Sequence, residues 1–463
     1  MRHRLAIFLQ RFMRWAEVDR AVLYAVLTKV WAVASGPVTL LLIASYFSPE
    51  LQGYYYTFNS VLALQVFVEL GLTTVVIQFA AHEWSKLDLG KRGEIVGNSV
   101  ALSRLMSLGQ ISLKWFTVGG MLVAIGLMIG GYIFFSQSDY PDVHWKWPWI
   151  LLSIMSGMSV CLLPIWSLLE GCNQVSSVYG FRMSQGILSN VVIWLTVILG
   201  AGLWAAGISA AIILVWSMVF LYHRHLPFLR TFISPIRGPR MSWRFEIWPM
   251  QWKIGLSWLS GYFTSSIFTP VLFHYHGAVV AGQMGMTWTL IGAVATISVA
   301  WVKTKVPRFG VLIANKEYAD LDRLFSRIFF VSLVVLLAGA FALWICVYLL
   351  NAMSHPMAER LLPPLPSGLF MLACVLTHIT VPFSYYLRAH KKEPYLWLNI
   401  ISGVLTGLSA WFFGSRFGVI GIGIGYLATV VFFTLPYGII VWYRCRSAWH
   451  SDVIGHAVVS SLE

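Results

Sequence analysis

The residues that could do chemistry in this chain are a few charged and amide side chains inside long apolar runs. Glu69 lies in the segment Gln65-Val-Phe-Val-Glu69-Leu-Gly71, one helical turn after the amide of Gln65, and Lys29 lies inside the first apolar run. A charge at the centre of a bilayer costs about 2.5–3.5 kcal/mol on insertion scales, so each such residue is a functional candidate. A carboxylate such as Glu69 can also take up and release a proton.

Lys29 and Glu69 are expected at similar depths in neighbouring helices. Lys29 follows Arg20 by nine residues, which is about 13 Å along a helix, and Glu69 lies about 16 Å from Ala80 on the same side. An ion pair between them is therefore one expectation. The alternative is that Lys29 extends toward water and that Glu69 is a protonated, hydrogen-bonded packing residue.

A second group of basic residues lies at the end of the eighth apolar run. Lys303, Lys305 and Arg308 follow one another there, and Lys253 opens the seventh run. Such cations could bind a phosphate. The alternative is the ordinary border of Lys and Arg that membrane helices carry at their cytoplasmic ends.

Long apolar runs must position these residues. Hydrophobic residues make up 58% of the chain and charged residues 11%, with a mean hydropathy of +0.74, which excludes a water-soluble fold. Apolar runs of about 20 residues predict spanning helices, because only a helix or a closed barrel satisfies its backbone in hydrocarbon. About twelve spans are predicted: residues 21–47, 57–80, 115–135, 148–169, 187–203, 206–222, 254–273, 283–302, 328–350, 367–387, 395–413 and 419–442.

The basic residues sort by side of the membrane, although the net charge is +14. Outside the helices, only Lys146, Arg360 and Arg416 fall on the side opposite the N-terminus, while Lys29 lies within a helix. This positive-inside pattern predicts cytoplasmic termini and contact with anionic lipid head groups rather than with nucleic acid. The expected organisation is an amphipathic segment (1–20), an N-lobe (21–222), a cytoplasmic linker (223–253), a C-lobe (254–442) and a cytoplasmic tail (443–463).

Internal matches predict a duplication of six helices. Three registers agree: Gly53 with Gly282 at an offset of 229, Pro164 with Pro382 at 218, and Gly200 and Gly207 with Gly414 and Gly421 at 214. An even number of helices per repeat gives two pseudo-symmetric six-helix lobes, which we expect to surround a central cavity. Gly71, Pro164 and Pro382 are the candidate hinges, since proline removes a backbone donor.

Three motifs give the chain a family resemblance. These are the turn Ser48-Pro49-Glu50-Leu51-Gln52-Gly53-Tyr54-Tyr55, the element Glu69-Leu70-Gly71-Leu72 and the helix end Leu169-Glu170-Gly171. Together with the two lobes, they resemble the Wzx-type O-antigen and polysaccharide flippases of the multidrug/oligosaccharidyl-lipid/polysaccharide exporter superfamily. The acidic-x-Gly element transfers Glu69 and Gly71; cavity roles for Lys29 and Lys253 rest on charge and depth.

The resemblance implies translocation of a polyprenyl-pyrophosphate-linked oligosaccharide across the bacterial cytoplasmic (inner) membrane by alternating access, for O-antigen, capsule or exopolysaccharide. It implies H⁺ or Na⁺ as coupling ion, no other cofactor, and a polysaccharide polymerase and a chain-length regulator as further partners. The alternative is a cation-coupled multidrug antiporter of the same superfamily, which would favour acidic cavity residues.

Catalysis and metal binding are not expected. The chain has no GxxxxGK[ST], GxSxG or HExxH motif. His274 and His276 lack the further ligand that a metal site needs. The five cysteines are scattered and predict no disulfide framework.

Overall fold

A computed structural model of the chain describes residues 20–90, 93–138, 140–390 and 392–460. The amphipathic segment expected at 1–20 lies outside the described residues except for its last residue. The chain forms two compact, helical units. Unit 1 comprises the chain through Leu51 together with Val61–Trp258, and unit 2 comprises Gln52–Ser60 together with the chain from Leu259 onward.

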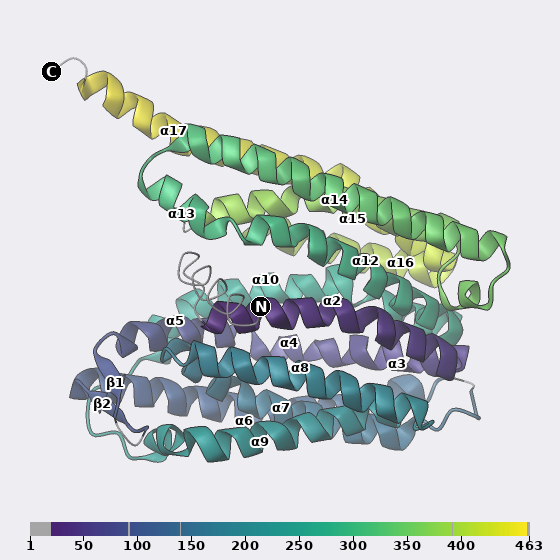
Figure 1. Ribbon diagram of the computed structural model, residues 1–463, viewed down its shortest axis with the longest axis horizontal. Helices are drawn as coiled ribbons and strands as arrows, with labels where there is room; N and C mark the ends of the chain where they lie inside the picture. Colours follow the sequence, from purple (N-terminus) through teal and green to yellow (C-terminus); the bar gives the residue numbers. More distant parts are fainter. Residues whose placement is uncertain (1–19, 91–92, 139, 391, 461–463) are drawn as a thin grey trace, which may run out of the picture. The chain divides into compact units, whose positions relative to one another are not determined.

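Unit 1 consists of helices joined by short connections (Figure 1). They are α2 (Arg20–Tyr46), the two ends of α3 (Pro49–Leu62), α4 (Val66–Glu69), α5 (Leu72–Trp84), α6 (Ser99–Phe135), α7 (Lys146–Gly171), α8 (Val175–Ile198), α9 (Trp204–Ile233) and most of α10 (Trp248–Ser265). An antiparallel hairpin of β1 (Leu87–Leu89) and β2 (Ile95–Gly97) joins α5 to α6. Asn98 begins α6, because its side-chain oxygen accepts the backbone N–H groups of Val100 and Ala101.

Unit 2 repeats this construction. Its helices are the central part of α3, the end of α10, α11 (Phe268–His276), α12 (Ala278–Lys303), α13 (Val306–Ala314), α14 (Tyr318–Ala352), α15 (Pro364–Ala389), α16 (Leu396–Thr429) and α17 (Leu435–Ser460). In unit 1, α6 packs along α7, α2 along α8, and α7 also against α5 and α9. In unit 2, α14 packs along α15, α11 along α16, and α15 also against α12 and α17. The helix pairs correspond in chain order, which supports the predicted pseudo-symmetric repeat.

Two glycines that the repeat matches lie against each other inside unit 2. A Cβ atom on Gly282 would lie 2.8 Å from the backbone nitrogen of Gly53, and a Cβ atom on Gly53 would overlap the carbonyl of Ala278. The buried Gln52 side chain donates to the carbonyl oxygens of Gly282 and Arg360, both at 3.0 Å. The start of α3 and the start of α12 therefore cross at backbone contact, which only glycine permits.

The helix α16 folds back on itself at Gly418, which has φ 61° and ψ −142°. Ser402 lies 2.8 Å from Thr434, and the Tyr395 hydroxyl donates to the carbonyl of Gly438 at 2.6 Å, so residues before and after Gly418 pair in antiparallel order. The break falls between the spans predicted at 395–413 and 419–442.

The chain is a polytopic helical membrane protein. In the described ranges, nine helical stretches are long and apolar enough to cross a membrane, or ten if α3–α4 and α5 form one bent span. One of the nine, Leu396–Trp449, contains both arms of the hairpin at Gly418. The α10–α11 pair, where the seventh span was expected, is not among them: the 18 residues of α10 include Gln251 and Lys253, and α11 has only nine residues. The count of twelve stays a prediction.

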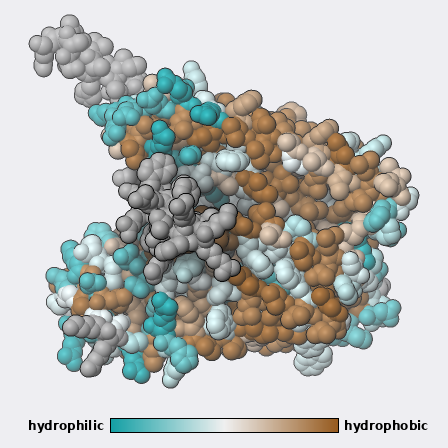
Figure 2. Space-filling model, viewed as in Figure 1, coloured by the Kyte–Doolittle hydropathy of each residue, from teal (hydrophilic) through white to brown (hydrophobic). Residues whose placement is uncertain are grey.

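Exposed apolar side chains cover the helices, as expected for contact with lipid. On α6, Met121, Leu122 and Ile129 are 59%, 61% and 57% exposed. Figure 2 shows apolar residues along the middle of the helices and hydrophilic residues gathered toward their two ends.

The connection between α9 and α10 is shorter than the predicted 223–253 linker. The helix α9 continues to Ile233, and a π-helical turn at Trp243–Ile247 leads directly into α10. Phe228 and Phe232 continue the buried face that includes Leu221 past the expected end of the span at residue 222, which explains why the helix does not stop there. Residues 234–242 are the part without regular structure.

Candidate functional site

The helix that contains Glu69 is broken directly after this residue. Leu70 and Gly71 both have left-handed backbones, with φ of 44° and 65°. The helical segments Pro49–Glu69 and Leu72–Trp84 meet there at 45°. Left-handed backbone at a residue with a side chain costs about 1–3 kcal/mol, so Leu70 marks a strained position.

The carboxylate of Glu69 lies at this break and is half-buried. The Thr73 hydroxyl donates to it at 2.6 Å across the break. The indole N–H of Trp115, on α6, donates to the Val68 carbonyl at 3.0 Å and so satisfies one carbonyl near the interruption. Gln65, on a 3₁₀ turn one helical turn earlier, accepts a hydrogen bond from Ser156 of α7 at 3.2 Å.

The helix α10 crosses the break at two glycines. A Cβ atom on Gly71 would overlap the side chain of Ile254, and one on Gly255 would lie 2.9 Å from the Leu70 carbonyl oxygen. Lys253 precedes Ile254 but is exposed, with its ammonium 5.8 Å from the centre of the Trp252 ring. The structure thus places the predicted residues Gln65, Glu69 and Gly71 in one local site, with the backbone of Lys253 beside it.

A broken membrane helix with a carboxylate at the interruption is a chemical arrangement suited to a small cation. Unwound backbone carbonyls and a carboxylate supply oxygen ligands for Na⁺, and the carboxylate alone can take a proton. The Thr73 hydroxyl adds a donor that holds the carboxylate in one orientation.

The expected ion pair between Lys29 and Glu69 is not formed. Lys29 is exposed on α2, and none of the ion pairs among the described residues joins it to Glu69. The physical reason is local: Thr73, one turn after Glu69, already binds the carboxylate, and α2 packs along α8. Lys29 is an exposed cation within a membrane-spanning helix.

The other basic candidates belong to unit 2. Lys303 ends α12 and lies 5.9 Å from the centre of the Tyr385 ring, while Lys305 and Arg308 lie at the start of α13. All three side chains are at least partly exposed, because α13 turns Phe309 and Leu312 inward. Glu69, in contrast, belongs to unit 1.

The two candidate prolines lie inside continuous helices. Pro164 is buried within α7 and Pro382 within α15. The helix end that follows each proline contributes one residue to an ion pair, and these two residues have opposite charges. Glu170 of α7 binds Arg182, and Arg388 of α15 binds Glu393 through both carboxylate oxygens, at 2.6–3.0 Å. The 218-residue offset matches Glu170 with Arg388, so the repeat keeps the position of a charge and inverts its sign.

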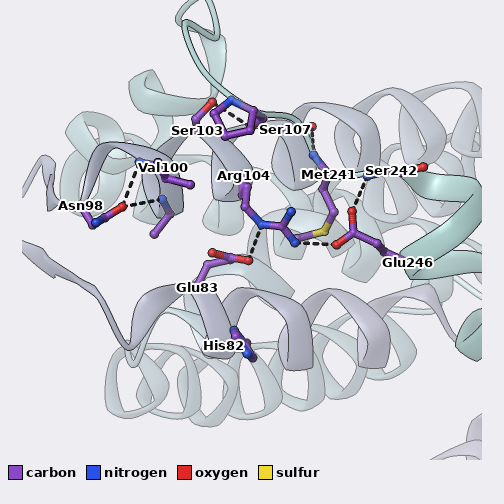
Figure 3. A network of polar contacts seen from close by, with 12 residues as sticks. His82, Glu83, Asn98, Val100, Ser103, Arg104, Ser107, Met241, Ser242 and Glu246 are labelled. Atoms are coloured by element: carbon purple, nitrogen blue, oxygen red, sulfur yellow. Dashed lines mark hydrogen bonds and ion pairs between the residues drawn. The ribbon is translucent and has the colours of Figure 1, made fainter.

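Figure 3 shows a polar clasp that sequence reasoning missed. Arg104 of α6 lies between two carboxylates: its Nε donates to Glu83 of α5 at 2.8 Å and its Nη2 to Glu246 at 2.5 Å. The backbone N–H of Ser242 donates to the other oxygen of Glu246 at 2.8 Å. This contact and the Arg104 guanidinium hold the pKa of Glu246 below its ordinary value. The clasp fixes the α9–α10 connection to α5 and α6.

Only spatial proximity reveals this clasp. Arg104 is 21 residues from Glu83 and 142 from Glu246, so the spacing of these residues in the sequence does not indicate a contact. Trp115 links the clasp to the break, since its ring stacks on Trp243 at 5.4 Å while its N–H binds Val68.

Within the described ranges, no three His, Cys, Asp or Glu side chains come together as a metal site, and the five cysteines are free.

Three solved structures of membrane proteins have a fold similar to that of this chain. A multidrug-resistance MATE transporter of the MOP superfamily, in an inward-facing conformation, aligns over 93% of this chain and 96% of its own, with a TM-score of 0.61 and 14% identity. The lipid II flippase MurJ aligns over 90% and 87%, with a TM-score of 0.59 and 13% identity. The Vibrio cholerae MATE transporter VcmN aligns over 93% and 97%, with a TM-score of 0.53 and 14% identity.

No protein-family model and no curated protein matches the sequence. The structural alignments nevertheless show that the chain has the fold of these three proteins. At such low identities the likeness concerns the fold alone.

Proposed function

We propose that this chain is a membrane transporter that moves a polyprenyl-pyrophosphate-linked oligosaccharide from the cytoplasmic to the outer leaflet of the bacterial inner membrane. The fold shared with MATE transporters and with a lipid II flippase supports transport as the general activity. The motifs around Gly53, Glu69 and Glu170 support the polysaccharide branch.

The observation that favours an anionic lipid-linked substrate is the exposed ammonium of Lys29. It lies within a membrane-spanning helix and makes no ion pair among the described residues. An unpaired cation at membrane depth is costly unless it meets an anion, and a pyrophosphate supplies one. A cationic drug would be repelled by the same charge.

Glu69 then serves the coupling ion rather than the substrate. Its carboxylate lies at the interruption between α4 and α5, where a proton or Na⁺ can be bound and released. Cytoplasmic termini, a polysaccharide polymerase and a chain-length regulator belong to the same proposal.

Deletion of the gene in its host tests this function. We expect lipid-linked repeat units to accumulate on the cytoplasmic face and surface polysaccharide to disappear. Lys29→Arg should restore the polysaccharide and Lys29→Gln should not, because only the former keeps the cation. Intact surface polysaccharide after deletion would refute the proposal.

The second candidate function is cation-coupled export of multiple drugs. The carboxylate of Glu69 at a helix break favours it, since such a site binds cations. Increased sensitivity of the deletion strain to cationic dyes, with unchanged polysaccharide, would favour this antiporter.

A further inference from the structure

A buried polar junction joins three helices of unit 2. Ser298 of α12, Ser332 of α14 and His378 of α15 meet there, and their exposed fractions are 0%, 0% and 2%. All three helices belong to membrane-spanning stretches. A titratable group inside hydrocarbon is a functional candidate, because its burial is costly.

The two serines bind each other's backbone. The Ser332 hydroxyl donates to the carbonyl of Ser298 at 2.9 Å, and the Ser298 hydroxyl donates to the carbonyl of Ser332. A hydroxyl has a single proton, so both protons are used in these bonds. Both hydroxyl oxygens are therefore acceptors toward a third partner.

That third partner is the Nε2 atom of His378, which lies 2.8 Å from the Ser332 oxygen and 3.2 Å from the Ser298 oxygen. Because both oxygens accept, Nε2 must bear the hydrogen. A neutral imidazole has one N–H, so Nδ1 keeps its lone pair, and it has no hydrogen bond to any residue that the structure describes. The junction fixes His378 in its neutral Nε2–H form.

The groups around the junction offer no counter-charge. Cys374 lies one turn before His378 on α15, and the hydroxyls of Thr377 and Tyr426 of α16 lie 3.4 Å apart. The charged residues nearest in the chain on the packed elements are exposed or paired at helix ends: Lys303 on α12, Arg308 on α13, Asp322 and Arg327 on α14, and Arg446, bound to Asp322, on α17. None of them contacts His378 among the described residues.

We propose that His378 is a proton-binding site of unit 2 that is proton-free while the junction is closed and takes up a proton at Nδ1 when α12 and α14 separate from α15. Protonation of the closed junction would bury a charge with no carboxylate to balance it. Opening the junction admits water, which solvates the imidazolium. Proton uptake and the opening of unit 2 are then linked.

The test measures unfolding temperature against pH in purified, detergent-solubilised protein. If the folded state excludes a proton that the unfolded chain binds, stability falls as the pH drops through the ordinary range of histidine, near 6.5. His378→Gln keeps an N–H donor for the two serines but cannot take a proton. We expect the wild type to lose about 2 °C or more beyond the loss of His378→Gln between pH 7.5 and 5.

Two further variants sharpen this test. His82→Gln, at an exposed position of α5, should keep the acid-dependent loss of the wild type. Ser298→Ala with Ser332→Ala removes both acceptors of the Nε2–H group, which an imidazolium needs more than a neutral ring does, so the folded state excludes the proton more strongly and the loss should be at least as large as in the wild type. This variant also decides the matter if His378→Gln fails to fold. Wild-type pH dependence in His378→Gln, or a smaller acid-dependent loss in the double variant than in the wild type, would overturn the proposal. The readout needs no substrate, so such a failure would leave the proposed transport function standing.

Discussion

At the residue scale, the central group is the carboxylate of Glu69. It is half-buried at an interruption of a membrane helix and is held by the Thr73 hydroxyl. A hydrogen bond to a charged group is worth about 1.5–3 kcal/mol, so the Thr73 hydroxyl stabilises one orientation of the Glu69 carboxylate.

Glu69→Gln should slow substrate translocation by about 10- to 100-fold and flatten its dependence on pH, because the amide cannot bind and release a proton. The measurement is the initial rate in proteoliposomes between pH 5.5 and 8.5. Glu317→Gln, at an exposed position beside α14, is the matched control and should behave as the wild type. A wild-type rate and pH profile in Glu69→Gln would remove this residue from coupling.

The clasp around Arg104 predicts a second pH effect, on stability. The pKa of Glu246 is held below its ordinary value, so its contribution is present above about pH 4.3 and is lost as the pH falls through the lower value of the folded state. Glu246→Gln should therefore unfold at a lower temperature than the wild type at pH 7, and the difference should shrink progressively as the pH falls below about 4.3. A difference that does not change with pH would contradict this origin.

Some of these residues could be predicted from the sequence and others could not. Glu69 and Gln65 stand out because a polar side chain is rare and costly inside an apolar run. The sequence left two alternatives for Glu69, an ion pair with Lys29 or a hydrogen bond, because helix depth alone does not reveal that Thr73 binds the carboxylate one turn away. The Glu83–Arg104–Glu246 clasp and the His378 junction join residues far apart in the chain, so only the fold reveals them.

At the scale of elements, the break between α4 and α5 depends on Gly71. Its left-handed backbone and its contact with Ile254 both exclude a side chain. Gly71→Ala should lower the free energy of unfolding by about 1–3 kcal/mol. Ile254→Ala in the same chain should recover the steric part of this loss but not the conformational part, as thermal unfolding would show. Full recovery in the double variant would mean that the positive φ costs nothing.

The sequence indicated Gly71 as a hinge but gave no sign that Leu70 shares the left-handed conformation, because leucine ordinarily continues a helix. The extent of α9 was also underestimated. The predicted span ends at residue 222, yet the buried positions Phe228 and Phe232 continue the helix to Ile233.

At the scale of the whole molecule, the internal repeat explains which helices pair within each unit. It was predictable because glycine and proline positions survive where the apolar residues between them have changed. The separation of the last two spans at Gly418 follows from the same signals. The contact of Gly53 with Gly282 could not be predicted from these signals, since sequence matching does not indicate which repeated elements are in contact.

This contact gives a prediction for the repeat. Gly53→Ala and Gly282→Ala should each destabilise the protein by about 1–3 kcal/mol, because a methyl group would meet backbone atoms. Gly126→Ala and Gly130→Ala on α6 are matched controls, as nothing lies within 4 Å of the added atom. The measurement is thermal unfolding of the purified variants, and equal effects at all four positions would show that the crossing is not tight.

The most direct test of the transport proposal is a leaflet-specific assay in proteoliposomes. A fluorescent polyprenyl-pyrophosphate-linked oligosaccharide is incorporated, and a membrane-impermeant reductant quenches only the probe in the outer leaflet. We predict that the wild type exposes the inner-leaflet probe to the reductant, that Lys29→Arg does so as well, and that Lys29→Gln is at least about tenfold slower. Inner-leaflet probe that stays protected in the presence of wild-type protein, together with uptake of a cationic drug by the same vesicles, would contradict the account.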